Sequence, residues 1–341
     1  MIWLTWRQFR VQALTAGAAL AAFAILLAVT GPHLVSRYAA SAITGCHGFG
    51  CQTAANTFLS QLQVTSAYPI VYLLGLALIL LAPAITGIFW GAPLIARELE
   101  TRTFALAWNQ SITRTRWLAV KLTLTGLAAM AVTEALSLGY AWWADPIRHA
   151  IDLGGSTSLF SGGRFSSLVF ATHGITPLGY AAFAFTLGTA AGVLIRRTVP
   201  AMALTLAIFA AAQVVMPLWV RPHLIPPDRT IVTIDSAQLD FGNLTATVVP
   251  GQPGAWILSS GAINHAGQTV SNLPVACQAS VLGLKPSSPS QCMESHGFRE
   301  AISYEPAGRY WPLQWIETGI FSALAVALAG FCFWRLGRRR T

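Results

Sequence analysis

One stretch of the sequence, residues 93–122, gathers charged side chains that could bind a partner or take part in chemistry. The segments on either side of it are strongly apolar and carry almost no charge. Because a charged side chain is costly in hydrocarbon, we expect this stretch to lie in water beside a membrane and to face a partner. Its charged members are Arg97, Glu98, Glu100, Arg102, Arg114, Arg116 and Lys121.

Motifs for catalysis and nucleotide binding are absent from the sequence. It contains no phosphate loop of the form GxxxxGK followed by Ser or Thr, no GxGxxG, no HExxH and no GxSxG. The 7 histidines are scattered, and no two of them have the spacing of metal ligands on one helix. We therefore predict that this chain has no catalytic residue, binds no metal or other cofactor, and does not hydrolyse ATP.

Polar side chains inside apolar segments are few. Glu134 is an acidic residue deep within one of them, and an intramembrane carboxylate costs about 2.5–3.5 kcal/mol on insertion scales. Three alternatives stay open for Glu134: contact with a substrate or proton, a hydrogen bond to Thr or Gln of a neighbouring helix, or a position closer to the membrane interface. Gln213 fits an interhelical hydrogen bond. Both are candidate pathway residues, whereas Glu317 is expected at the membrane interface.

Four of the 5 cysteines fall as two close pairs in polar segments, Cys46 with Cys51 and Cys277 with Cys292. Paired loop cysteines are typical of disulfides in an oxidising compartment, and unrelated reduced thiols are the alternative. Neither pair has CxxC spacing, so we do not expect a zinc site. The fifth, Cys332, lies in an apolar segment.

The composition is that of a polytopic membrane protein. The 341 residues are 54% hydrophobic and 10% charged, against about 25% charged in soluble domains. Six apolar segments are long enough to cross a ~30 Å hydrocarbon core as helices. Pro83 predicts a kink, and the small-xxx-small pattern Gly87–Gly91 favours close helix contact. The fourth apolar segment contains Gly188-Thr-Ala-Ala-Gly192. The expected spans are 11–31, 68–95, 118–144, 168–195, 199–220 and 313–334.

The remaining segments complete a fold that is all-α in the membrane with a small β-rich domain outside it. Trp and Arg in MIWLTWRQFR predict an N-terminal amphipathic helix at the interface. Alternating β-branched residues at 230–234 and 244–249 predict the β-rich domain between helices 5 and 6. Asp145-Pro146 is expected to end the third span, before a flexible Gly/Ser-rich loop. The predicted domains are 1–10, 11–220 with the charged segment 96–121, 221–312, and 313–341.

The distribution of basic residues predicts the orientation in the membrane. Of the 21 Lys and Arg, 13 lie in the N-terminus, the segment 96–121, the turn 196–197 and the C-terminal tail. These are short segments beside span ends, where the positive-inside rule applies. Both termini are therefore expected in the cytoplasm, with the paired cysteines outside. This pattern also explains the net charge of +9 without a nucleic-acid partner.

The charged stretch also resembles a known family. It reads Arg-Glu-x-Glu-Thr-Arg-Thr from Arg97, then Phe-Ala-Leu-Ala-Trp, Ser-x-Thr-Arg and Trp-Leu-x-x-Lys. This order is similar to the cytoplasmic segment after the second transmembrane helix of ABC-2-type permeases, the membrane subunits of ABC exporters, and most similar to actinobacterial members. There an acidic run precedes a Gly-Thr or similar pair, a short amphipathic helix, a turn and a basic residue. Arg102 stands where the family often has Gly.

The resemblance implies the permease subunit of an exporter in the plasma membrane. Its expected partners are a cytoplasmic ABC ATPase chain, which would hold ATP and Mg²⁺, a second permease chain, and membrane lipids. Acidic residues before an apolar helix and basic residues after it also suit the helix macrodipole. A helix lying on lipid headgroups is the alternative, which Glu98 and Glu100 disfavour. The residues expected to couple to the ATPase are Glu98, Glu100, Arg102, Thr103, Phe104, Trp108, Ser111 and Arg114.

The substrate is not predicted beyond an amphiphilic drug, lipid or peptide. A second hypothesis is a membrane sensor or structural protein whose domain 221–312 binds a ligand. A membrane enzyme is the least supported, because no set of catalytic residues converges in the sequence.

Overall fold

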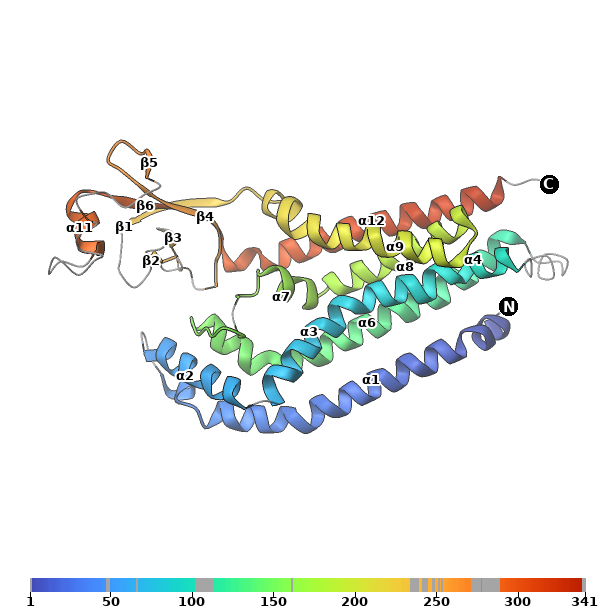
Figure 1. Ribbon diagram of the computed structural model, residues 1–341, viewed down its shortest axis with the longest axis horizontal. Coiled ribbons are helices and arrows are strands. Elements are labelled where there is room, and N and C mark those ends of the chain that lie inside the picture. Colours follow the sequence, from blue (N-terminus) through green and yellow to red (C-terminus); the bar gives the residue numbers. More distant parts are fainter. Residues whose placement is uncertain are drawn as a thin grey trace.

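The computed structural model shows a long bundle of helices with a small sheet at one end (Figure 1). We name the end of the bundle that carries the sheet the sheet end. The opposite end, where α1 begins and α12 ends, is named the terminal end. The structure describes residues 2–46, 50–65, 67–101, 113–160, 162–233, 239–240, 245–246, 249–250, 252, 254–270, 277 and 289–338.

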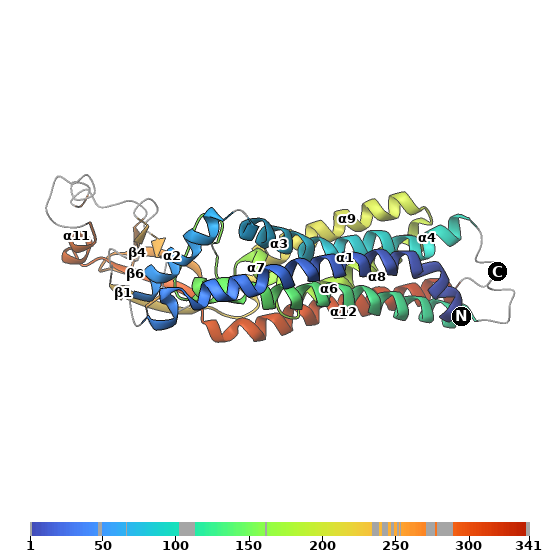
Figure 2. The same ribbon diagram turned by 90° about the horizontal axis from the view of Figure 1, so that it is seen from below.

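Within these residues, six helical segments are long and apolar enough to cross a membrane, as predicted. They run side by side along the length of the bundle (Figures 1 and 2). The segments are Phe9–Ala39, Ala67–Glu100, Thr115–Asp152, Thr176–Ile195, Thr198–His223 and Ala307–Gly337. The helices that form them are α1 (Ile2–Ala39), α3 (Ala67–Thr86), η2 (Gly87–Gly91), α4 (Ala92–Glu100), α6 (Arg114–Asp152), α8 (Thr176–Ile195), α9 (Thr198–Val215), η3 (Met216–Val220), η4 (Arg221–His223), η5 (Ala307–Arg309) and α12 (Tyr310–Gly337).

Helix α8 lies at the centre of the bundle. It packs against α3, η2, α4, α6, α9 and α12, and 72% of its apolar window is buried, against 11% for α1. Its sequence is apolar all round rather than amphipathic, as expected of a helix that is surrounded on every side. Helices α1 and α9 lie at the periphery and leave apolar side chains exposed, which fits contact with lipid or another chain.

The two small-xxx-small patterns lie at one helix crossing. Gly87 and Gly91 bound η2, a π-helical turn, and Gly188 of α8 lies against Gly87, while Gly91 and Gly192 face other residues across the same crossing. A Cβ atom on Gly188 would lie 2.2 Å from the carbonyl oxygen of Gly87, and one on Gly91 would lie 2.4 Å from that of Phe185. The backbones therefore touch, and no larger residue fits this crossing.

Three predicted helix ends differ from the structure. α1 continues through Pro32 to Ala39, and α6 continues through Pro146 to Asp152. The predicted interfacial helix 1–10 is continuous with the first span in α1. Both extensions are held by packing: beyond the prolines, Leu34 and Ile147 are fully buried in one apolar cluster with α2 (Gly50–Val64). Burial of this face outweighs the hydrogen bond that proline removes.

The predicted fourth span is broken near its N-terminal end. α7 (Ser167–Thr172) stops before Gly174, whose φ of +70° favours glycine, and α8 begins at Thr176. The amide of Gln314 in α12 fills the break: its oxygen accepts from the backbone N–H groups of Ile175 and Thr176, each at 3.1 Å. Its nitrogen donates to the carbonyl oxygens of Phe170 (3.2 Å) and His173 (3.1 Å). One side chain thus satisfies the backbone groups that the break exposes.

Glu317, expected at the interface, is instead fully buried. It forms a bidentate ion pair with Arg221, with Nε to Oε2 at 2.9 Å and Nη2 to Oε1 at 3.1 Å. The hydroxyl of Tyr180 in α8 also donates to the Glu317 carboxylate. The guanidinium lies 3.9 Å from the centre of the Phe170 ring. The pair joins the end of the fifth span to the start of the sixth, a long-range contact that neither local sequence reveals.

The segment between the fifth and sixth spans is β-rich, as predicted, and contains an antiparallel sheet with strand order β1-β6-β4-β5. The strands are β1 (Asp228–Thr233), β4 (Trp256–Ile263), β5 (Thr269–Val270) and β6 (Arg299–Glu305). A second pair joins β2 (Leu239–Asp240) to β3 (Thr245–Ala246), and α11 (Pro289–Ser295) packs nearby. Disulfides join Cys46 to Cys51 and Cys277 to Cys292, the pairs that the sequence suggested.

Gly188→Ala should lower the thermal unfolding midpoint in detergent, because its methyl group would overlap the backbone of η2. Overpacking of this kind costs about 1–3 kcal/mol. Gly330→Ala is the matched control, since a Cβ at that helical glycine meets nothing within 4 Å. A midpoint for Gly188→Ala equal to that of the control would show that the crossing is not tight.

Acid should destabilise the protein through His173. Burial, helped by the positive charge of Arg148, lowers the pKa of His173 from 6.5 to about 4. Between these values the unfolded chain binds a proton that the native ring does not, so the free energy of unfolding falls as the pH falls. The slope is up to about 1.4 kcal/mol per pH unit.

His173→Gln should therefore reduce the fall in the unfolding midpoint between pH 6.5 and pH 4.5. His33→Gln, at an exposed position, serves as the control and should keep the slope of the original protein. If the unfolding midpoint changed equally with pH in the original protein and in both variants, His173 would not be the group responsible.

Candidate functional site

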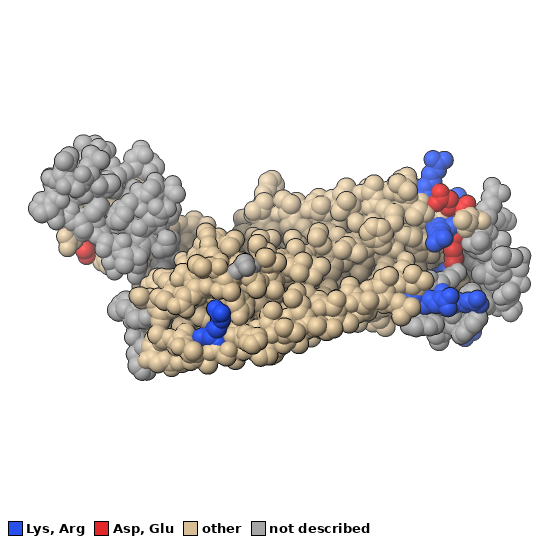
Figure 3. All heavy atoms as spheres, turned by 60° about the horizontal axis from the view of Figure 1, so that its bottom comes forward, with Lys and Arg blue, Asp and Glu red and all other residues tan. Residues whose placement is uncertain are grey.

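Charged side chains gather at the terminal end of the bundle, next to a long flank without charge (Figure 3). This end carries the stretch predicted to couple to an ATPase. Residues 102–112 of that stretch lie outside the described part of the chain, including Arg102, Thr103, Phe104, Trp108 and Ser111. Arg114 is described by its backbone alone, as the first residue of α6. Glu98, Glu100 and Lys121 are described in full.

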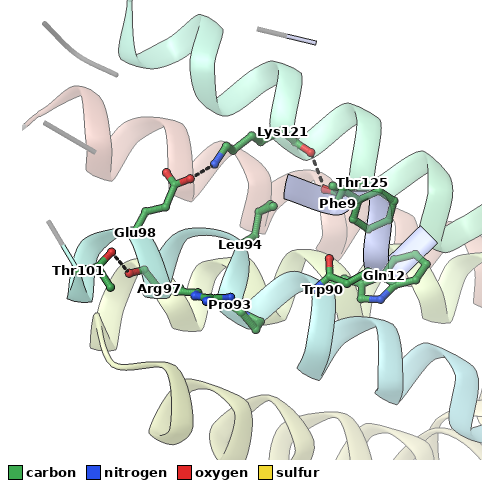
Figure 4. A pocket seen from close by; sticks show the side chains of 10 residues that line it. All are labelled: Phe9, Gln12, Trp90, Pro93, Leu94, Arg97, Glu98, Thr101, Lys121 and Thr125. Atoms are coloured by element: carbon green, nitrogen blue, oxygen red, sulfur yellow. Dashed lines mark hydrogen bonds and ion pairs between the residues drawn. The ribbon is translucent and has the colours of Figure 1, made fainter. Parts of the chain in front are cut away.

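A cavity of about 470 Å³ opens beside the stretch (Figure 4). One part of its wall is apolar and comes from Phe9 of α1, Trp90 of η2 and Leu94 of α4. The other part is charged and comes from Arg97, Glu98 and Lys121. This volume lies within the roughly 300–1,000 Å³ typical of small-molecule pockets. The remaining lining residues are Gln12, Pro93, Thr101 and Thr125.

The N-terminal part of α1 is attached to this cavity by two contacts. The rings of Phe9 and Trp90 meet edge to face with centroids 4.8 Å apart. The Gln12 amide donates to the carbonyl oxygen of Phe89 at 3.0 Å. Because η2 is a π-helical turn, its carbonyl groups are displaced from the regular α-helical pattern, as is common at functional sites.

Glu98 forms an ion pair with Lys121 that joins α4 to α6 (Figure 4). Both partners are shielded from water, with 15% and 4% of their side chains exposed. The Lys121 ammonium also lies 4.8 Å from the ring centre of Trp117, which adds a cation–π contact. A pair in this setting fixes the two helices relative to each other, because separating it would leave a charge poorly solvated.

Glu100 joins α4 to α9. One of its carboxylate oxygens accepts hydrogen bonds from Thr198, at 3.2 Å from the backbone nitrogen and 2.8 Å from the hydroxyl. Thr198 is the first residue of α9, so the negative charge also faces the positive end of that helix dipole. The preceding turn is tight, with Arg196 in the left-handed conformation (φ 59°). α4 is therefore bonded to α6 on one side and to α9 on the other.

Glu134 and Gln213 lie on different helices, α6 and α9, and neither lines the cavity. Their Oε2 and Nε2 atoms, respectively, are buried and have no hydrogen-bond partner among the described residues. The described residues therefore supply no neighbouring Thr or Gln as a partner for the Glu134 Oε2, which was one of the alternatives for this residue. Both remain candidate pathway residues.

The described residues contain one group of possible metal ligands, Cys277, Cys292 and His296. The two cysteines form a disulfide with each other, so the group lacks free thiolates.

The sequence did not predict the bonds of Lys121 and Thr198, because their partners Glu98 and Glu100 lie 23 and 98 residues away along the chain. The sequence feature that pointed most directly to such a bond was Lys121, which lies one turn inside a predicted span. A charge at such a position needs a partner.

A family model described as ABC-2 membrane transporter related matches residues 17–221. The match begins within α1 and ends at Arg221, so it contains the stretch 96–121 but not the sheet. No curated protein and no solved structure matches the chain.

Lys121→Met should lower the unfolding midpoint, because it removes the buried ammonium that pairs with the shielded Glu98 carboxylate. Removing one member of a buried pair costs about 3–5 kcal/mol. Combining Lys121→Met with Glu98→Gln should recover part of the loss, since both charges are then gone. Arg116→Met, at an exposed position of the same helix, should change stability by less than about 0.5 kcal/mol. Additive effects of the two substitutions would show that the pair is not coupled.

Proposed function

The chain belongs to the ABC-2 membrane transporter-related family, whose model matches more than half of it, and from this premise we propose that it is the permease subunit of an ABC exporter. It moves an amphiphilic substrate across the plasma membrane, and a separate cytoplasmic ATPase chain hydrolyses the ATP with Mg²⁺. The family match over residues 17–221 is the observation that carries this proposal.

The proposed orientation places the terminal end in the cytoplasm and the sheet outside. The excess of Lys and Arg in the segments at the terminal end supports it. The two disulfides support it independently, because both belong to the sheet end and such bonds persist in oxidising compartments. The cavity at the terminal end then faces the cytoplasmic leaflet, where its apolar and charged walls suit an amphiphile.

Force from the ATPase enters through the segment 102–112 and passes through α4. The Glu98–Lys121 pair carries movement of α4 to α6, and the Glu100–Thr198 bonds carry it to α9. This assigns Glu98 and Glu100 a role different from the docking role that their charge alone indicates, since their carboxylates are already bonded within the chain. Docking then falls to the apolar residues, above all Phe104 and Trp108.

A second permease chain completes the pathway. A single unit of six spans leaves the peripheral helices α1 and α9 with 11% and 22% of their apolar windows buried. Exposed side chains such as Leu206 and Val214 of α9 and Leu218 of η3 give the fifth span an apolar surface. Pairing of two chains along such faces would enclose a route between them, with surrounding lipid covering the rest.

Docking and force transmission should separate by mutation. Replacing Phe104 and Trp108 by Asp should reduce co-purification of the ATPase subunit by about tenfold or more, as loss of aromatic anchors does at interfaces. Glu100→Gln should leave co-purification unchanged but lower the ATPase activity of the assembled complex in nanodiscs, by about tenfold, because the charge-assisted bonds to Thr198 weaken.

Trp334→Asp is the control for docking, since Trp334 is an exposed aromatic residue near the end of α12, outside the stretch. If no ABC ATPase subunit co-purifies with the original chain from its native membrane, the permease proposal is wrong. If Glu100→Gln abolishes association instead, the carboxylate docks and does not transmit.

A further inference from the structure

A second cavity, of about 260 Å³, lies at the sheet end between α3, α6 and α12. It is smaller than the roughly 300–1,000 Å³ of typical ligand pockets, so it suits a headgroup rather than a whole amphiphile. Its lining brings together charges of both signs and three aromatic rings. They are Asp145, Arg148, Asp152, Arg164, Tyr72, Tyr310 and Trp311.

The charges in this cavity form two ion pairs that leave bonding capacity unused. Arg148 Nη2 lies 2.7 Å from Asp145 Oδ1, and Arg164 Nη2 lies 2.5 Å from Asp152 Oδ2. Arg148 lines the cavity with 34% of its side chain exposed, so its guanidinium can donate to a ligand. Asp145 has 70% of its side chain exposed, so its second oxygen can accept from a ligand. The cavity therefore offers a guanidinium donor and a carboxylate acceptor a short distance apart.

The level of the cavity in the membrane is marked by tryptophan. Trp311 and Trp315, in the first two turns of α12, have 55% and 65% of their surface exposed, and Trp219, near the end of the fifth span, has 75%. Exposed tryptophans of this kind lie at the depth of the lipid headgroups. Trp311 also lines the cavity, so the cavity opens at headgroup depth.

We propose that this cavity binds the zwitterionic headgroup of a membrane amphiphile, with its phosphate on Arg148 and its ammonium on Asp145. The balance of two arginines and two aspartates favours a ligand with both charges over a purely anionic one, which would meet the two carboxylates. The ring of Tyr310 lies 5.8 Å from the Arg164 guanidinium and holds it at the wall. Acyl chains would then leave past Trp311 into the bilayer.

Native mass spectrometry of the full chain, titrated with defined lipids, tests the proposal. Phosphatidylethanolamine should bind more tightly than phosphatidylglycerol, which has the phosphate but no ammonium. Arg148→Gln should weaken phosphatidylethanolamine binding by about tenfold or more, as expected for loss of charge-assisted hydrogen bonds. Asp145→Asn should remove the preference between the two lipids; because this side chain is largely exposed, the variant also guards against misfolding of Arg148→Gln.

Arg37→Gln is the matched control, because Arg37 is exposed at the same end of the bundle and does not line this cavity. Glycerophosphoethanolamine, which has the headgroup without acyl chains, distinguishes a lipid from a soluble zwitterion. Equal binding of this compound and the lipid would overturn the membrane source. Equal binding of the two lipids to the original chain, or binding unchanged by Arg148→Gln, would overturn the headgroup site.

Discussion

The contact between the backbones of η2 and α8 is the constraint on which the rest of the bundle depends. Two helices approach this closely only where small residues line the crossing, and here glycine stands at its tightest points on both helices. The crossing places α8 at the centre and brings the second span alongside it. It also fixes where α4 begins, and therefore where Glu98 and Glu100 meet their partners on α6 and α9. The positions of the charged side chains at the terminal end thus depend on the uncharged contact between η2 and α8, several helical turns away.

Polar side chains provide a second set of fixed points, nearer the sheet end. Gln314 satisfies the broken helix between α7 and α8, and Glu317 pairs with Arg221 and Tyr180 three residues further along α12. Buried ion pairs contribute little net stability, because desolvation offsets the attraction, but breaking one is costly. These polar contacts therefore act mainly on the specificity of helix packing. Gln314 and Glu317 both reach their partners in only one register of α12 against α8. Glycine sets the distance between the second and fourth spans, and hydrogen bonding sets the register of α12 against α8.

Hydropathy alone predicted the number and order of the spans, because crossing a hydrocarbon core requires length and apolarity that any reading of the sequence reveals. Alternation of β-branched residues predicted a β-rich domain, but not the order or the antiparallel pairing of its strands. The ends of helices were harder, since Pro32 and Pro146 signal a stop locally while burial of Leu34 and Ile147 keeps the helix going. The bonds of Glu98, Glu100 and Glu317 could not be predicted, because each partner is distant in sequence and only the packed fold brings it near. For the same reason, charge pattern indicated where the candidate site lies but not what its carboxylates contact.

The sheet is tied to the bundle at both of its ends. Arg221 precedes it and is bound to α12, while Arg309 follows it and bonds Asp228 at the start of β1 and Glu305 at the end of β6. A domain held at two such points cannot swivel freely on a tether, so its tilt records the angle between the fifth and sixth spans. The orientation of the sheet therefore reports on the arrangement of the membrane-spanning helices. A spectroscopic label on β4 would detect rearrangements of those helices.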